Sequence, residues 1–84
     1  MKWKDNIGDI LKQERKSWGM SRKRLARLAY VDRYTIEDIE NGLIRNPNFF
    51  DMLNICDVLD SSVYFFLLDE KEDSYYGTRR NIPS

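Results

Sequence analysis

Residues 20–29 read MSRKRLARLA, residues 30–32 read YVD, and residues 33–42 read RYTIEDIENG. Ser21 and Asp32 belong to the residue types that cap the N-terminus of a helix, and Gly42 belongs to the type that ends one. Apolar residues recur at helical spacing between these signals. The stretch therefore predicts two short helices, 22–29 and 33–41, joined by a short linker.

Helical spacing continues on the N-terminal side of this stretch. It predicts a helix over about 6–18, which Asp5 or Asn6 can cap and Gly19 can end. The apolar face of this helix carries Ile7, Ile10, Leu11 and Trp18.

On the C-terminal side two more helices are predicted, and Pro47 fits the first turn of the earlier one. Its apolar positions are Phe49, Met52, Leu53, Cys56 and Leu59. The last helix is expected over 63–68, capped by Ser61 or Ser62, and residues 69–84 are expected to form a flexible polar tail. The predicted fold is therefore all-α, with five short helices in one domain at 1–68 and its core at 7–68.

The inward faces of these helices predict a single small core. Residues 22–29 turn Leu25, Leu28 and Ala29 inward. The expected core residues are Ile7, Ile10, Leu11, Leu25, Ala26, Val31, Ile36, Ile39, Met52, Leu53, Cys56 and Leu59. Their spacing is explained by packing, so we assign no chemistry to them.

Composition excludes most kinds of active site. A chain of 84 residues has room for one small domain. Its single cysteine cannot form an internal disulfide, and without histidine there is no Cys/His zinc cluster and no imidazole base. No apolar run is long enough to cross a membrane. We therefore expect a cytoplasmic protein that is not an enzyme and needs no metal and no cofactor.

Charge is distributed unevenly although it sums to zero. Residues 12–45 contain nine basic and five acidic residues, a net charge of +4, whereas residues 46–73 contain one basic and seven acidic residues, a net charge of −6. The first segment is suited to meet phosphate, and the second should repel polyanions. Two solvated faces of opposite sign would explain the same numbers.

The short helix, linker and second helix form a helix-turn-helix pattern. Three features of the sequence support this pattern: the pair Leu25-Ala26, the string Ile-Glu-Asn-Gly at 39–42, and the later Pro47 with Cys-Asp-Val-Leu at 56–59. Together they resemble the phage-repressor and Cro type helix-turn-helix family, also called the xenobiotic response element family. The resemblance covers residues 7–68. It implies a compact five-helix, lambda-repressor-like domain that binds double-stranded DNA as a dimer, with helix 33–41 in the major groove.

Three positions depart from the family pattern. Tyr30 stands where the linker usually has glycine, so either a left-handed tyrosine carries a cost of about 1–2 kcal/mol or the turn is rearranged. Arg22 replaces a glutamine at the start of the second helix, and a basic contact can substitute for a polar one. The third departure is the acidity of helix 33–41, which carries Glu37 and Asp38.

Phosphate contacts are expected mainly around helix 22–29. Cations in its first turn face the positive end of the helix dipole, which indicates that a polyanion rather than helix stability explains them. The resemblance adds positions in and after helix 33–41. The expected phosphate contacts are Arg22, Lys23, Thr35, Asn41 and Arg45.

Base contacts are expected from the outward face of helix 33–41. By resemblance, Arg33, Tyr34 and Asp38 match positions that read base edges, and Glu37 shares their outward arc. An arginine can pair with guanine, a carboxylate can accept from a cytosine amino group, and a tyrosine can pack on a thymine methyl. The two carboxylates have a second interpretation, as groups that only interact with the helix dipole. Our hypothesis is that they suppress non-specific binding.

One charged pair is expected to be structural. The family pairs the positions of Arg15 and Glu40 in a partly buried salt bridge, so the resemblance implies that this bridge joins the first helix to the third.

Self-association is expected through the last predicted helix. The run 63–68 is apolar on every side, so one face can enter the core while Tyr64, Phe65 and Leu68 stay uncovered. These residues are the expected dimer contacts, unless the tail folds back over them within one chain.

These observations support a sequence-specific transcriptional regulator that represses by occupying its operator as a homodimer. The alternative is a protein-interaction module of the same fold, an antitoxin or anti-repressor that binds a partner protein through its acidic and aromatic C-terminal part. An enzyme is the weakest interpretation, because Glu37 and Asp38 share one helix with no histidine, ligand cluster or glycine-rich phosphate loop beside them.

Overall fold

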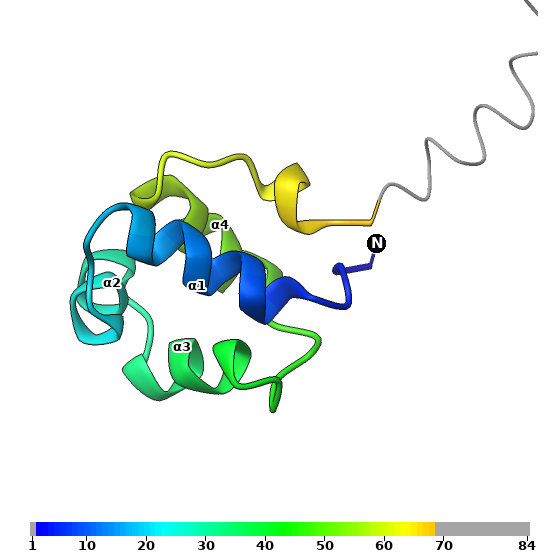
Figure 1. Cartoon of the computed structure of the whole chain (residues 1–84), viewed down its shortest axis with the longest axis horizontal. Helices are drawn as coiled ribbons and strands as arrows, with labels where there is room; N and C mark the ends of the chain where they lie inside the picture. The colour runs from blue at the N-terminus through cyan, green and yellow to red at the C-terminus, as the bar shows by residue number, and fades with distance from the viewer. Residues whose placement is uncertain (1, 69–84) are drawn as a thin grey trace, which may run out of the picture.

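The computed structural model describes residues 2–68, and the expected tail at 69–84 lies outside them. Four α-helices and one 3₁₀ helix follow in order: α1 Ile7–Ser17, α2 Arg22–Ala29, α3 Arg33–Glu40, α4 Phe49–Val58 and η1 Val63–Phe66 (Figure 1). The expectation of five α-helices is therefore wrong for the last element. The described residues contain four, because η1 is one tight turn and Leu67 then pairs with Trp3 in an antiparallel β-bridge.

Side-chain caps define where most helices begin. The Ser21 hydroxyl accepts a hydrogen bond from the Arg24 amide at 3.0 Å, and the Asp32 carboxylate accepts one from the Tyr34 amide at 2.8 Å. Asn48 caps α4 by accepting from two amides, so Pro47 precedes the cap and does not occupy the first helical turn as predicted. Asn6 stands at the start of α1 but makes no side-chain cap.

Left-handed residues follow all four α-helices, and one of them shapes the turn between α2 and α3. Gly19 and Gly42 have φ values of 68° and 80°, as expected of residues that end helices. Tyr30 has φ 59° and ψ 40°, so the turn keeps left-handed geometry with a side chain in place. The Val31 amide donates to the Ala26 carbonyl at 3.0 Å and closes the end of α2.

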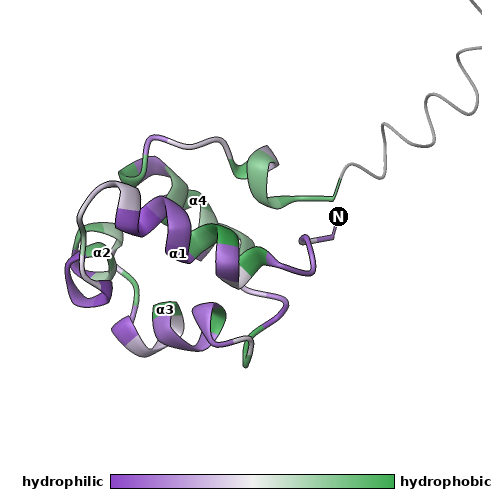
Figure 2. Cartoon of the chain, viewed as in Figure 1, coloured by the Kyte–Doolittle hydropathy of each residue, from purple (hydrophilic) through white to green (hydrophobic). Residues whose placement is uncertain are grey.

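The core forms where the inward faces of the helices meet, and Figure 2 shows the hydrophobic character concentrated on α4 and η1. Most expected core residues are buried, and Ile10 and Val31 are half-buried against them. Two expectations are wrong: Leu28 is 42% exposed and Leu53 is 38% exposed. Leu28 instead lines a surface pocket together with Asn54, Asp57 and Val58 of α4. Trp18 lies at the rim, 52% exposed, with its indole N–H donating to the Leu59 carbonyl at 2.8 Å.

The N-terminal segment closes the bundle, which the sequence did not predict. The Lys4 amide donates to the Phe66 carbonyl at 2.9 Å, and the Leu68 amide donates to the Lys2 carbonyl at 2.8 Å. Trp3 is buried between them, and its indole N–H donates to the Pro47 carbonyl at 3.0 Å. The two ends of the described chain therefore support each other on the side of α1 away from α3 (Figure 1).

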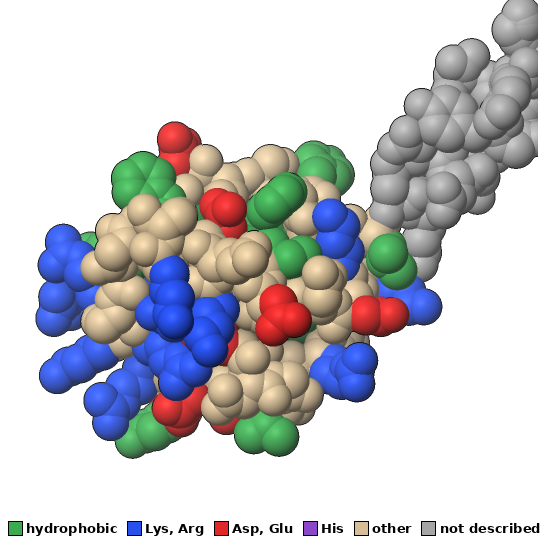
Figure 3. Space-filling model, in the orientation of Figure 1, with side chains coloured by type: hydrophobic (Ala, Val, Ile, Leu, Met, Phe, Trp, Pro, Cys, Tyr) green, Lys and Arg blue, Asp and Glu red, His purple; other side chains and the backbone are tan. Residues whose placement is uncertain are grey.

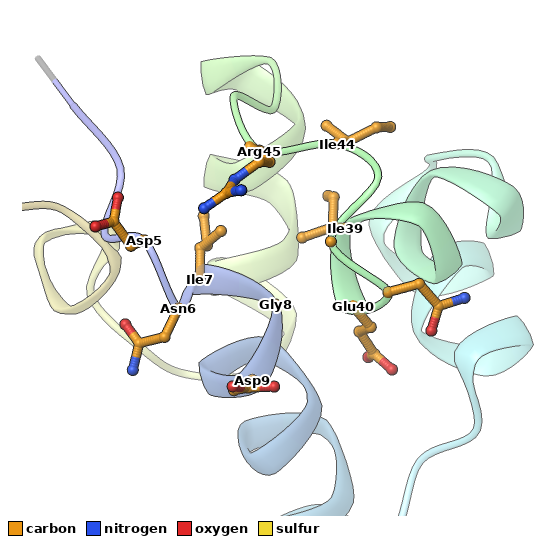
Figure 4. A pocket seen from close by; sticks show the side chains of 11 residues that line it. Asp5, Asn6, Ile7, Gly8, Asp9, Ile39, Glu40, Ile44 and Arg45 are labelled. Atoms are coloured by element: carbon orange, nitrogen blue, oxygen red, sulfur yellow. The ribbon is translucent and has the colours of Figure 1, made fainter.

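Close packing fixes α1 against the end of α3. Gly8 lies so near the Ile39 carbonyl that a Cβ there would collide with the backbone. Beside this contact a shallow pocket of about 260 Å³ opens between the start of α1 and the loop after α3. Figure 4 shows the Arg45 side chain reaching across it toward the N-terminal end of α1.

Candidate nucleic-acid interface

Helix α2 presents only positive charge. Its eight residues include four cations and no acidic residue. Lys23, Arg24 and Arg27 are exposed, whereas Arg22 is half-buried. Figure 3 shows Lys and Arg side chains gathered at the α2 end of the molecule. A phosphate backbone near this surface would meet several cations at once.

The outward side of α3 has a different character. Arg33 and Tyr34 are exposed at its N-terminal end, Asn41 is exposed just past its C-terminal end, and Glu37 and Asp38 are half-buried between them. Thr35 is also half-buried.

Arg33 and Tyr34 form one stacked unit. The guanidinium carbon of Arg33 lies 4.9 Å from the centroid of the Tyr34 ring, and its Nη2 donates to the Tyr34 hydroxyl at 3.1 Å. This hydrogen bond, followed by the charge interaction with the same group, raises the pKa of Arg33. The pair presents a fixed cation and a flat apolar ring at the start of α3, and both can contact base edges.

A buried charge cluster joins α1, α2 and α3. Arg15 donates from Nε to Glu40 Oε2 at 2.7 Å and from Nη2 to Glu40 Oε1 at 2.9 Å, while its Nη1 donates to the Met20 carbonyl at 2.7 Å. Arg22 Nε adds a further bond to Glu40 Oε1 at 2.9 Å. The pair expected from the family pattern is thus present, and Arg22 extends it.

The chemistry of Glu40 follows from these partners. Its side chain is fully buried, and burial by itself would raise the pKa of the carboxyl. The hydrogen bonds and positive charges of Arg15 and Arg22 outweigh that effect and hold the pKa of Glu40 below its ordinary value. Glu40 is therefore a negatively charged structural anchor, not an acid that exchanges protons near neutral pH.

Arg22 was predicted to contact phosphate, but the structure also gives it acidic partners. Besides Glu40, its Nη1 lies 3.5 Å from Glu37 Oε2. Sequence reasoning missed both contacts, because 18 residues separate Arg22 from Glu40 and no local spacing rule connects them. Arg22, Glu37, Asn41 and Arg45 lie toward the C-terminal end of α3, whereas Arg33 and Tyr34 occupy its other end.

The predicted dimer contacts lie on another part of the surface. Tyr64 is 79% exposed, and Phe65 and Leu68 are also exposed, while the intervening Phe66 and Leu67 are buried. Lys4 places its ammonium 5.3 Å from the centroid of the Phe65 ring. Figure 1 shows η1 and α3 on different sides of α1, so these contacts and the outward side of α3 can be used together.

Other kinds of site find little support among residues 2–68. No group of three or more His, Cys, Asp or Glu side chains in this range is arranged to hold a metal ion. None of its helices has the length and apolar character needed to span a membrane. Burial, together with the nearby Glu14 carboxylate, raises the pKa of the Cys56 thiol to about 11, so this cysteine stays protonated and unreactive at neutral pH.

Comparison with known proteins bears on the same elements. A helix-turn-helix family model matches residues 11–66, a range that includes α2, α3, α4 and η1. The chain belongs to this helix-turn-helix family. Its resemblance to phage-repressor and Cro type regulators is thereby confirmed.

Several of the proteins that are similar to this chain are forms of the regulator SinR. The HTH-type transcriptional regulator SinR of Bacillus subtilis strain 168 is 40% identical over 70 residues, which cover 83% of this chain and 62% of that protein. The N-terminal DNA-binding domain of SinR superposes with a TM-score of 0.74 at 34% identity, covering 80% of this chain and 97% of the domain. A crystal structure of SinR, described as the master regulator for biofilm formation, in complex with DNA gives a TM-score of 0.67 at 38% identity, covering 69% and 92% of the two chains.

The chain thus spans less than two thirds of the length of the SinR protein that it matches. The match to the SinR DNA-binding domain, by contrast, includes nearly all of that domain.

Proposed function

We propose that this chain is a sequence-specific DNA-binding transcriptional regulator, and that it acts as a repressor by occupying an operator. The observation that carries the proposal is the exposed Arg33 and Tyr34 pair at the start of α3, in a fold that a DNA-bound relative shares. In the helix-turn-helix mode the second helix enters the major groove N-terminal end first. Arg33 and Tyr34 would then meet the base edges.

Phosphate contacts would hold α3 in register. Lys23 is exposed at the start of α2, where the free amides of the first helical turn also favour an anion. Asn41 and Arg45 are exposed beyond the C-terminal end of α3. Together with Arg22 and Thr35 they would contact both sides of the groove, while Glu37 and Asp38 face the bases between them.

Dimerisation would supply the second half-site. The exposed side chains of Tyr64, Phe65 and Leu68 form the apolar surface that we assign to the two-fold contact. A homodimer built this way would present two copies of α3 to an operator with two half-sites about one helical turn apart.

The test is a selection from randomised duplexes, followed by salt titration on the best site. We expect an enriched motif of two half-sites and a steep decrease in affinity with salt. Tyr34→Ala should blur the base preference, whereas Phe50→Ala, the matched control for an exposed aromatic on α4, should leave it unchanged. Absence of enrichment at low salt would reject the proposal and direct the search to a protein partner for the surface around Tyr64.

A further inference from the structure

Arg22 has two acidic partners, and they hold it with different strength. Its Nε donates to Glu40 Oε1 at 2.9 Å, and Glu40 is fully buried and already bonded twice to Arg15. Its Nη1 lies at 3.5 Å from Glu37 Oε2, which is the outer limit of a hydrogen bond. The guanidinium group is therefore anchored at one edge and loosely held at the other.

The loosely held edge is accessible to solvent. The side chain of Arg22 is 31% exposed and that of Glu37 is 43% exposed. A half-exposed pair of this length exchanges partners readily, because water and other anions compete for the same N–H groups. By contrast, breaking the bond to Glu40 would leave a buried carboxylate with one partner fewer.

A phosphate oxygen and the Glu37 carboxylate would compete for the same cation. A guanidinium carries five N–H groups, so a phosphate can reach Arg22 through those that Glu40 and Glu37 do not use, but the charge of Arg22 is then shared among three anions. A phosphate bound there lies close to the Glu37 carboxylate on the outward side of α3, and the two anions repel each other. Only a donor in the groove, such as the amino group of cytosine, offsets that repulsion.

We propose that Glu37 is a specificity-determining residue that competes with DNA phosphate for Arg22. Every duplex that brings a phosphate to Arg22 meets the repulsion of Glu37, and only a site with a suitable base donor offsets part of it. This inference rests on the proposed DNA-binding function. It also separates the two adjacent carboxylates of α3, Glu37 and Asp38, by mechanism, because no basic side chain of residues 2–68 forms an ion pair with Asp38.

Asp38→Asn is therefore the matched control for Glu37→Gln. Both substitutions remove one negative charge from adjacent positions of α3, but only Glu37→Gln also removes a partner of Arg22. The measurement is equilibrium binding to the selected site and to a random duplex across a range of salt, for each single variant, Arg22→Gln and the double variant Arg22→Gln/Glu37→Gln. Thermal unfolding of each variant checks that folding is retained.

We expect Glu37→Gln to tighten binding to the random duplex by about 2- to 5-fold, the range of a half-exposed ion pair, and to tighten binding to the selected site less. Its salt dependence should steepen by about one phosphate contact. Asp38→Asn removes an expected base contact, so its comparison is made on the random duplex, where it should change affinity and salt dependence less than Glu37→Gln. In the Arg22→Gln background Glu37→Gln should have no larger effect on the random duplex than Asp38→Asn.

Two results would overturn the inference while leaving the proposed function intact. One is an equal effect of Glu37→Gln and Asp38→Asn, which would mean that charge alone acts. The other is an unchanged effect of Glu37→Gln when Arg22 is absent. Failure of the wild type to bind any duplex would instead reject the proposed function, and this inference with it.

Discussion

Helices α2 and α3 are equally long, pack against each other and carry opposite kinds of charge. Helix α2 has four cations and no acid, whereas α3 has one cation, Arg33, followed by Glu37, Asp38 and Glu40. A phosphate backbone has the same charge at every sequence, so α2 would attract any duplex. Helix α3 would contribute binding free energy only where hydrogen-bond donors on base edges offset the negative charge of its carboxylates. Under the proposed function, affinity and selectivity would be divided between the two helices.

The helix dipole strengthens this interpretation. Cations are unfavourable at a helix N-terminus and anions are unfavourable near a C-terminus, by a few tenths of a kcal/mol each. Helix α2 begins with Arg22, Lys23 and Arg24, and α3 ends with Asp38 and Glu40. Helix stability therefore does not explain these charges. Glu40 is explained by its buried ion pairs, and the other charges agree with the proposed binding of DNA.

Loss of Glu40 should have the largest effect, because this residue joins the two helices. Glu40→Gln would leave Arg15 buried without a carboxylate partner, and we expect the free energy of unfolding to decrease by about 3–5 kcal/mol. Urea denaturation followed by circular dichroism measures this change. The control is Glu37→Gln, whose half-exposed pair should contribute at most about 1 kcal/mol. Equal effects of the two substitutions would show that the buried cluster does not couple the helices.

Acidification should also weaken the cluster around Glu40. The stability lost in this way should not exceed the roughly 3–5 kcal/mol expected for Glu40→Gln. Because the pKa of Glu40 is lower in the folded chain than in the unfolded one, its contribution is complete above the unfolded value of about 4.3 and is lost as pH decreases through the folded value. We therefore expect wild-type stability to decline more steeply below about pH 4 than that of Glu40→Gln. Parallel pH profiles of the two proteins would contradict this expectation.

The proposed division between the helices can be tested with one cation from each. Arg33→Ala should weaken binding to the selected site by about 1–3 kcal/mol and leave random duplex nearly unaffected. Lys23→Gln should weaken both complexes similarly and lower the salt slope by about one. Fluorescence anisotropy at several salt concentrations measures both quantities. If Lys23→Gln changed the base preference and Arg33→Ala did not, the assignment would be reversed.

Local rules predicted much of the fold, because caps and helix ends depend on neighbouring residues. Ser21 and Asp32 cap the helices expected of them, and α2 has the predicted bounds. The segment 63–68 was predicted incorrectly because its apolar run does not distinguish a helix from a tight turn followed by a bridge. The bridge is decided by Trp3, which pairs with Leu67 but lies far from it in the sequence.

The candidate site was only partly predictable, for the same reason. The exposure of Tyr34 follows from helical periodicity once Ile36 and Ile39 are placed inward, whereas periodicity places Arg33 only at the edge of the outward arc. The contacts of Arg22 with Glu37 and Glu40 depend on how α2 crosses α3, and no periodicity within either helix encodes that crossing. The sequence identified the charged residues but not which of them neutralise each other.

The smallest expected effect concerns Tyr30, the left-handed residue between α2 and α3. Its side chain is 92% exposed, so it contributes little packing to offset its backbone cost. Tyr30→Gly should relieve about 1–2 kcal/mol of strain but increase the entropy of the unfolded chain, for a net gain of about 0.5 kcal/mol in urea denaturation. Tyr30→Ala, which keeps the strain, should not be stabilised. Duplex affinity should stay the same in both variants if packing and the Glu40 cluster, rather than this linker, fix how α2 and α3 meet DNA. A loss of affinity in Tyr30→Gly at undiminished stability would instead assign that geometry to the turn.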